Sequence, residues 1–157
     1  MIWKILEYFH RRENWGDPEK MNPNLMFMLD RFRRELPKGL WIKVHCGFDT
    51  MGHSENSQHY LGNAVDFHVV GCHILEAESH LHKFLKSNDL FDYVGLGIYP
   101  DWNNPGFHID VRGKYARWGY LAPKEGEKDG KSISYIEALN KMRKENGEQL
   151  RVDKFKS

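Results

Sequence analysis

Two histidines and one aspartate have the residue types and spacing of a metal site. His59 and Asp66 lie in the run SQHYLGNAVDFHV, and His108 lies in GFHIDVR. Two imidazoles and one carboxylate are the ligand count of a catalytic zinc site, in which a fourth position stays open for water. The residue types therefore indicate zinc chemistry.

Both stretches have the alternation of half-buried β-strands. Apolar Val65, Phe67 and Val69 alternate with Ala64, Asp66 and His68, and apolar Phe107, Ile109 and Val111 alternate with His108, Asp110 and Arg112. Gly62 lets the chain turn between His59 and the first strand. We therefore expect two strands of one sheet to present the ligands from the same face.

The same residues carry a resemblance. Five positions, Ser57, His59, Gly62, Ala64 and Asp66, reproduce the S-x-H-x-x-G-x-A-x-D signature of the zinc D-alanyl-D-alanine carboxypeptidase and endolysin superfamily. This superfamily includes phage L-alanyl-D-glutamate endopeptidases and the hedgehog signalling domain. The segment VGLGIYPDWNNPGFHIDVRGKYARWGY is similar to the G-x-G-x-Y-P…F-x-H-x-D-x-R close of one bacterial and phage branch.

The similarity covers roughly residues 9–120. It implies that His59, Asp66 and His108 bind zinc and that the substrate is a peptidoglycan stem peptide.

Peptide hydrolysis by a zinc site also needs a group that accepts the proton of the attacking water. Many relatives carry an acidic residue three positions before the last histidine, where this chain has Pro105. Asp110, on the same strand face as His108, is either this base or an acceptor that orients a ligand histidine. Asp101 is a more distant alternative.

Substrate anchoring also departs from the relatives. Many of them have arginine in a G-Y-R context where this chain reads Gly47-Phe48-Asp49. Arg112 is expected either to clamp a substrate carboxylate in its place or to pair with a surface carboxylate.

Other polar residues have two interpretations each. Ser57 either orients a ligand or is an ordinary turn serine. His68 either stabilises an oxyanion or is a structural strand histidine, and His45 has the same status. His53 lies in a polar loop, residues 47–58, that we expect to cover the site entrance, and it either approaches the metal or is solvated. Tyr99, Trp102 and Trp118 either line the substrate site or pack as core and rim residues. Cys46 and Cys72 are expected to be free thiols; the less favoured alternative is a contribution to the metal site.

The composition limits the classes of partner that the chain is expected to bind. The chain has 157 residues, with 23 basic and 22 acidic side chains and a net charge of +1. This balance argues against nucleic acid as the main partner. The apolar stretches are too short to span a bilayer, and the N-terminus has no secretory signal pattern. We expect a monomer that is synthesised in the cytoplasm, as fits a phage-derived lysin released to the wall by other means.

The elements predict one α+β domain over residues 1–157, with helices packed on one side of a mainly antiparallel sheet, as in the hedgehog and D-alanyl-D-alanine peptidase fold. Asn22-Pro23 begins a helix, residues 40–46, 92–99 and 106–112 form further strands, residues 74–85 form a second helix, and Ser134 with Glu137 caps a helix over residues 134–146. The tail, residues 152–157, is expected to fray. The expected function is a zinc metallopeptidase of the cell wall, and the alternative is a catalytically inactive zinc-containing binding or virion module.

Overall fold

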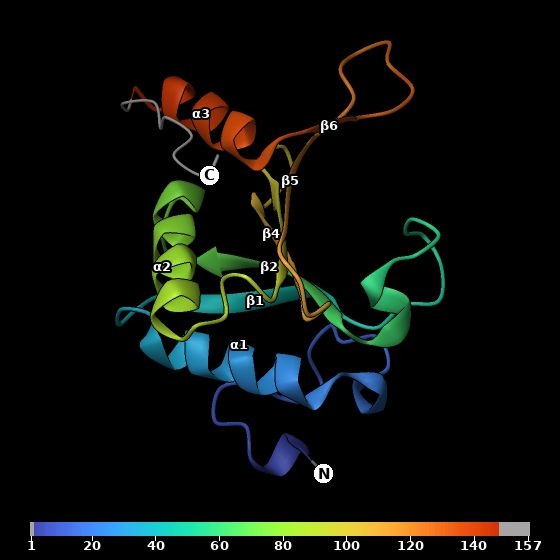
Figure 1. Ribbon diagram of the computed structural model, residues 1–157, viewed down its shortest axis with the longest axis vertical. Helices are drawn as coiled ribbons and strands as arrows, with labels where there is room; N and C mark the ends of the chain where they lie inside the picture. Colours follow the sequence, from blue (N-terminus) through green and yellow to red (C-terminus); the bar gives the residue numbers. More distant parts are fainter. Residues whose placement is uncertain (1, 148–157) are drawn as a thin grey trace.

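A six-stranded sheet carries the functional residues, and three α-helices cover one of its faces (Figure 1). The computed structural model describes residues 2–147, so the predicted frayed tail lies outside the described residues. The strand order is β1 (Trp41–Cys46), β2 (Ala64–Val70), β4 (Gly106–Asp110), β3 (Gly95–Tyr99), β5 (Ala116–Leu121) and β6 (Lys131–Ile133). Neighbouring strands are antiparallel except for β3 and β5, which run parallel. The predicted α+β class is confirmed, whereas β5, β6 and the parallel pair were not predicted.

The helices begin where the sequence predicts them to begin. Asn22 caps α1 (Pro23–Glu35) by accepting a hydrogen bond from the Asn24 N–H, and Pro23 occupies the first turn. Helix α2 spans Ile74–Ser87, and α3 (Tyr135–Glu145) begins with the predicted capping box of Ser134 and Glu137. Among residues 2–147, no helix combines the length and apolar character needed to cross a bilayer.

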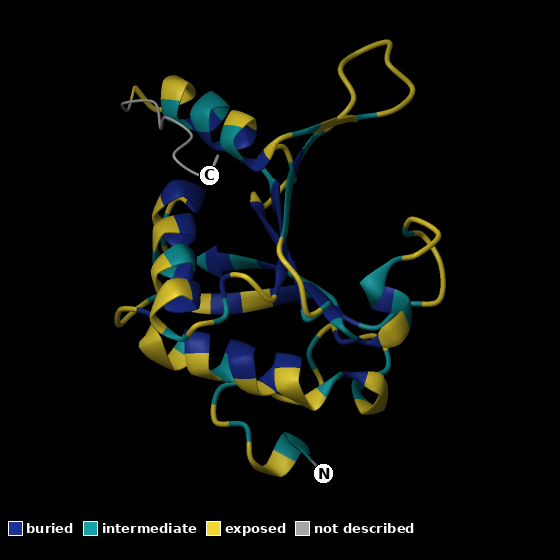
Figure 2. Cartoon of the chain, viewed as in Figure 1, coloured by how far each residue is buried: buried dark blue, intermediate teal, exposed yellow. Residues whose placement is uncertain are grey.

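The hydrophobic core lies between the sheet and the helices (Figure 2). Val65, Phe67 and Val69 of β2 are buried, as their alternation predicts. The Phe32 ring of α1 lies 6.4 Å from that of Phe67 and 5.2 Å from that of Phe84 in α2, measured between centroids. Since this packing occupies one face of β2, Asp66 projects from the other face.

The N-terminal segment packs against the backbone that follows β1. Trp15 is fully buried, and its indole N–H donates to the His10 carbonyl over 2.8 Å. The Trp15 carbonyl accepts a 2.8 Å hydrogen bond from the Phe48 N–H. This contact fixes the backbone directly after β1, from which the loop over the site departs.

Candidate metal centre

The three predicted ligands converge on one point. The His59 Nε2 atom lies 3.2 Å from Asp66 Oδ1 and 3.1 Å from His108 Nδ1, and His108 Nδ1 lies 2.9 Å from Asp66 Oδ1. Ligand atoms 2.0–2.1 Å from a tetrahedral zinc ion are about 3.3–3.4 Å apart. The donor set therefore fits a zinc ion after an outward shift of a few tenths of an ångström.

Strand pairing explains how Asp66 and His108 meet. In the register of β2 and β4, Asp66 stands directly opposite His108. Side chains of directly opposed residues lie on the same face of a sheet, about 4.5–5.5 Å apart at Cβ. The expected presentation of both ligands from one sheet face is thus confirmed.

His59 reaches the same point from a one-turn 3-10 helix, η3 (Gln58–Leu61). Ser57 caps this turn, and its hydroxyl accepts a hydrogen bond from the His59 N–H over 3.3 Å. Gly62 ends the turn with φ +69°, and a Cβ there would collide with the Lys20 carbonyl. Ser57 therefore positions a ligand through the backbone, and glycine is the residue that this tight exit requires.

Each ligand imidazole is oriented by a hydrogen bond from its other nitrogen. His59 Nδ1 lies 2.6 Å from the Gly47 carbonyl oxygen, so this nitrogen donates and leaves the Nε2 lone pair for a metal. His108 Nε2 lies 2.9 Å from Asp110 Oδ2, which leaves Nδ1 for a metal. Both free lone pairs belong to the atoms that converge with Asp66.

Asp110 is fully buried, and both of its carboxylate oxygens are occupied. Besides His108, Oδ2 accepts a 2.6 Å bond from Arg112 Nη2, and Oδ1 accepts bonds from Arg112 Nε over 2.7 Å and the Arg112 N–H over 3.2 Å. Burial alone would raise the pKa of this carboxyl, but Arg112 and His108 hold it well below its usual range. Of the two expected roles, this geometry supports the orienting one.

The partner of Arg112 corrects one expectation. The sequence offered a surface carboxylate as an alternative partner, but the guanidinium grips the buried Asp110 in a bidentate pair. Arg112 also lines the pocket above the ligands, so contact with a substrate stays a prediction.

Two glycines of β3 make room for these groups. A Cβ on Gly95 would lie 2.5 Å from both Asp110 Oδ2 and Arg112 Nε, and a Cβ on Gly97 would lie 2.5 Å from Trp118 Nε1. Small residues at both positions let the ion pair and the indole pack against the strand. This is a physical reason for the G-x-G element, which the sequence alone did not supply.

The charges of the cluster favour a cation. Burial lowers the pKa of His59, but its hydrogen bonds to Asp66 and Cys46 and the charge of Asp66 outweigh this effect and raise the pKa to about 9. Burial likewise raises the pKa of Asp66, but His108 and His59 reverse the direction and lower it to about 2. A divalent cation bound here would exchange with protons on the imidazoles.

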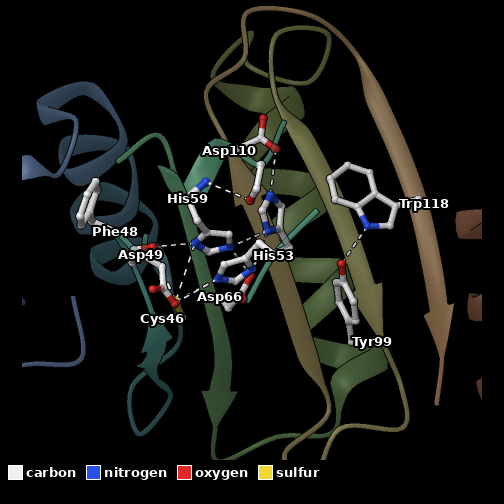
Figure 3. A network of polar contacts seen from close by, with 12 residues as sticks. Cys46, Phe48, Asp49, His53, His59, Asp66, Tyr99, Asp110 and Trp118 are labelled. Atoms are coloured by element: carbon white, nitrogen blue, oxygen red, sulfur yellow. Dashed lines mark hydrogen bonds and ion pairs between the residues drawn. The ribbon is translucent and has the colours of Figure 1, made fainter. Parts of the chain in front are cut away.

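A pocket of about 690 Å³ opens over the ligands, within the usual size of small-ligand sites. The loop predicted to cover the entrance forms one wall, through Gly52, His53, Ser54, Asn56, Ser57 and Gln58. Tyr99, Trp102 and Trp118 contribute an aromatic wall, in which the Tyr99 and Trp102 rings stack at 4.2 Å. Tyr99 also accepts a 2.9 Å hydrogen bond from the Trp118 indole (Figure 3).

Two other candidate residues, His68 and Asp101, have partners outside the ligand set. His68 Nδ1 lies 2.6 Å from His45 Nε2, and the two rings stack at 4.8 Å. His68 is not among the residues that line the large pocket, and its oxyanion role stays a prediction. Asp101 accepts a hydrogen bond from the Ala122 N–H and pairs with Lys141.

Pro105 lies on the side of the sheet that the helices cover. It lines a small cavity with His73, Ile74 and Met142, whereas His108 faces the large pocket. A side chain at this position therefore points away from the metal ligands. An acidic residue at position 105 of this fold would not reach the ligands without a change in the backbone.

For His53 and Cys46 the sequence left proximity to the metal open as the less favoured alternative, and the structure places both beside His59. The rings of His53 and His59 stack at 4.1 Å. The polar loop that follows Cys46 was a signal for this proximity, but it fixed no distance.

Comparison with known proteins gives a distant relative. The probable peptidoglycan L,D-endopeptidase MepK of Haemophilus influenzae is 26% identical over 120 residues, which cover 69% of this chain and 60% of that protein. The chain thus spans less than two thirds of the relative's length. No family model matches the chain, and no solved structure gives a significant match. The relative is bacterial, and the comparison gives no support to the expected phage origin.

Proposed function

We propose that the chain is a zinc-dependent peptidase that cleaves a peptide bond in the stem peptides of peptidoglycan. The convergence of His59 Nε2, Asp66 Oδ1 and His108 Nδ1 beneath a pocket of about 690 Å³ carries the proposal. The similarity to a probable peptidoglycan L,D-endopeptidase supports the substrate class.

The pocket favours an endopeptidase over a carboxypeptidase. A carboxypeptidase needs a cation that grips the free carboxylate of its substrate. Position 49, where many relatives have arginine, is aspartate, and the guanidinium of Arg112 is already engaged by Asp110. We therefore propose cleavage within the stem peptide, in the L,D-endopeptidase manner that the relative's name describes.

Each residue has a defined part in this proposal. When bound, zinc would supply Lewis acidity toward the scissile carbonyl and toward the attacking water. The Gly47 carbonyl holds the proton on His59 Nδ1, and Asp110 Oδ2 holds the proton on His108 Nε2, so the two coordinating lone pairs keep their direction. The aromatic wall packs against the peptide and excludes water from one side.

A non-hydrolytic binding module is the second candidate. One observation favours it, since Asp66 is the one carboxylate among the described residues that line the pocket, and its Oδ1 belongs to the metal-binding set. A module of this kind would bind the wall without cutting it.

Incubation of the zinc-loaded protein with purified peptidoglycan separates the two candidates. The proposal expects new amino termini in the released fragments by mass spectrometry, and their loss in His108→Gln and after chelation. Wall binding by the zinc-loaded wild type without any new amino terminus would reject the peptidase and favour the module.

A further inference from the structure

A second group of metal-ligating atoms adjoins His59 (Figure 3). Cys46 Sγ lies 3.7 Å from His53 Nε2 and 3.9 Å from Asp49 Oδ2, and His53 Nε2 lies 3.4 Å from Asp49 Oδ2. The ligand atoms of Cys46, His53 and His59 all lie within 4.8 Å of one another. A thiol, a carboxylate and an imidazole thus face one small volume.

The His53–Asp49 separation is long for a hydrogen bond, and all three separations are close to those between ligands that share an ion. An N–H···O hydrogen bond joins atoms 2.7–3.2 Å apart. A tetrahedral zinc ion with bonds of about 2.3 Å to sulfur and about 2.0–2.1 Å to nitrogen and oxygen separates sulfur from either atom by about 3.5–3.6 Å, and nitrogen from oxygen by about 3.3–3.4 Å. The observed 3.7, 3.9 and 3.4 Å follow this pattern.

Each of the three side chains is held in place by contacts of its own. Cys46 ends β1 directly after an irregularity in the register, opposite Asp66. Asp49 Oδ1 accepts hydrogen bonds from the Thr50 and Met51 N–H groups over 2.7 and 3.3 Å, which turns Oδ2 toward the cluster.

His53 is fixed by Tyr60 and by His59. The Tyr60 hydroxyl accepts a bond from the His53 N–H over 3.0 Å and donates to the His53 carbonyl over 2.8 Å. The His53 ring stacks on His59 with an interplanar angle of 17°. His53 Nε2 is therefore directed at Cys46 and Asp49 by contacts outside the cluster.

We propose that Cys46 Sγ, Asp49 Oδ2 and His53 Nε2 form a second site for a thiophilic divalent cation of the zinc class, independent of the peptidase proposal. His59 contacts this site by stacking and keeps its Nδ1–H on the Gly47 carbonyl. The Cys46 thiol would release its proton to solvent on binding, because the thiolate is the metal ligand. Thiolate and carboxylate together balance the charge of the ion, which limits its repulsion toward a cation held by Asp66.

An ion bound at this second site would hold one wall of the pocket in place. Asp49 and His53 belong to the loop between β1 and η3, whereas Cys46 belongs to the sheet. An ion at this site would cross-link the loop to the sheet, next to the residues that form one side of the pocket.

Cobalt(II) titration of the full chain tests the proposal, because a cobalt–thiolate bond gives a charge-transfer band in the near ultraviolet. We expect the wild type to bind two equivalents with this band. Cys46→Ser and His53→Gln should each bind one equivalent, and Cys46→Ser should lose the band. Cys72→Ser is the matched control, because it removes the other free thiol and should keep both equivalents and the band.

The outcomes separate this site from the first one. His108→Gln should lose one equivalent and keep the thiolate band. A wild type that binds one ion with the band, kept in His108→Gln, would uphold the second site and reject the first. A wild type without the band at saturation would overturn the second site, as would Cys46→Ser that still binds two equivalents. His53→Gln, in a partly exposed loop, keeps the test valid if Cys46→Ser does not fold.

Discussion

Substitution of Asp110 by asparagine distinguishes an orienting residue from a general base. The change keeps the size of the side chain and removes its charge. An asparagine presents one acceptor oxygen, whereas Asp110 accepts from His108 Nε2 and from two nitrogens of the Arg112 side chain. The amide nitrogen would therefore face another donor, either the imidazole or the guanidinium.

The magnitudes follow from burial and contacts. Breaking a buried ion pair costs 3–5 kcal/mol, and we expect about 3 kcal/mol of unfolding free energy because Arg112 can turn to solvent. The Arg112 side chain is 27% exposed, against 0% for Asp110. Loss of a partner that orients a ligand histidine weakens metal binding about 10–100-fold. We expect the turnover of Asp110→Asn at saturating zinc to fall less than about 10-fold, because the coordinating atoms are unchanged.

Three measurements test this reasoning. They are denaturant unfolding of the metal-free protein, zinc affinity by competition with a chromogenic chelator, and stem-peptide cleavage at saturating zinc. Asp101→Asn is the control, because Asp101 is a carboxylate outside the pocket lining. Zinc affinity equal to wild type, with a turnover about 10²–10⁴-fold lower, is the signature of a lost acid or base. That result would refute the orienting role and make Asp110 the base.

Four further results are expected. Gly95→Ala should destabilise the fold by about 1–3 kcal/mol and weaken zinc binding, because the new Cβ displaces the Asp110–Arg112 pair. Unchanged thermal unfolding and unchanged zinc affinity would contradict this. Ser57→Ala should lower the free energy of unfolding by about 1 kcal/mol. Ser57→Asn should lower it much less, because asparagine can cap the same turn. Equal losses for the two variants in urea titrations would reject the capping role. Zinc binding at pH 7 should release protons, because the pKa of His59 in the metal-free fold is about 9, so calorimetric enthalpies should depend on the buffer; identical enthalpies in buffers of different ionisation heat would contradict this. The same proton stabilises the metal-free fold fully below pH 6.5, and that contribution is lost as the pH rises through about 9, which unfolding at several pH values can follow.

The ligand set could be predicted from the sequence because period-two alternation fixes which residues share a strand face. Asp66 and His108 fall on the polar faces of two strands whose apolar residues are buried. Their direct opposition depends on the register of β2 and β4, which alternation alone leaves free by steps of two residues.

Strands β5 and β6, at the far edge of the sheet, could not be predicted in this way. The β5 sequence ARWGYL has no clean alternation, and its residues are mostly half-buried. Its pairing partner β3 precedes β4 in the chain, so the parallel contact skips one strand. Local propensity carries little information on such a pairing. The pairing nevertheless brings Trp118 against Gly97 at the pocket.

The loop between β1 and η3 shows a different limit. Asp49 and His53 have no periodic relation to Cys46, and their distances depend on loop backbone and on the Tyr60 hydroxyl. The sequence could identify Asp49 as a departure from an arginine, but it could not show that a carboxylate there faces a thiol.

Pro105 and Asp49 then have a common consequence for mechanism. Pro105 is exposed and lines a small cavity separate from the pocket over His108, and proline supplies no acid at this position. Among the described residues that line the pocket, Asp66 is the one carboxylate and His53 the one imidazole outside the first ligand set. If Asp110→Asn keeps its turnover, the second oxygen of Asp66 and the nitrogens of His53 are the remaining candidates in this lining for the acceptor of the water's proton. Occupation of His53 Nε2 by a second ion would remove this nitrogen from the candidates, so the cobalt titration also constrains the base.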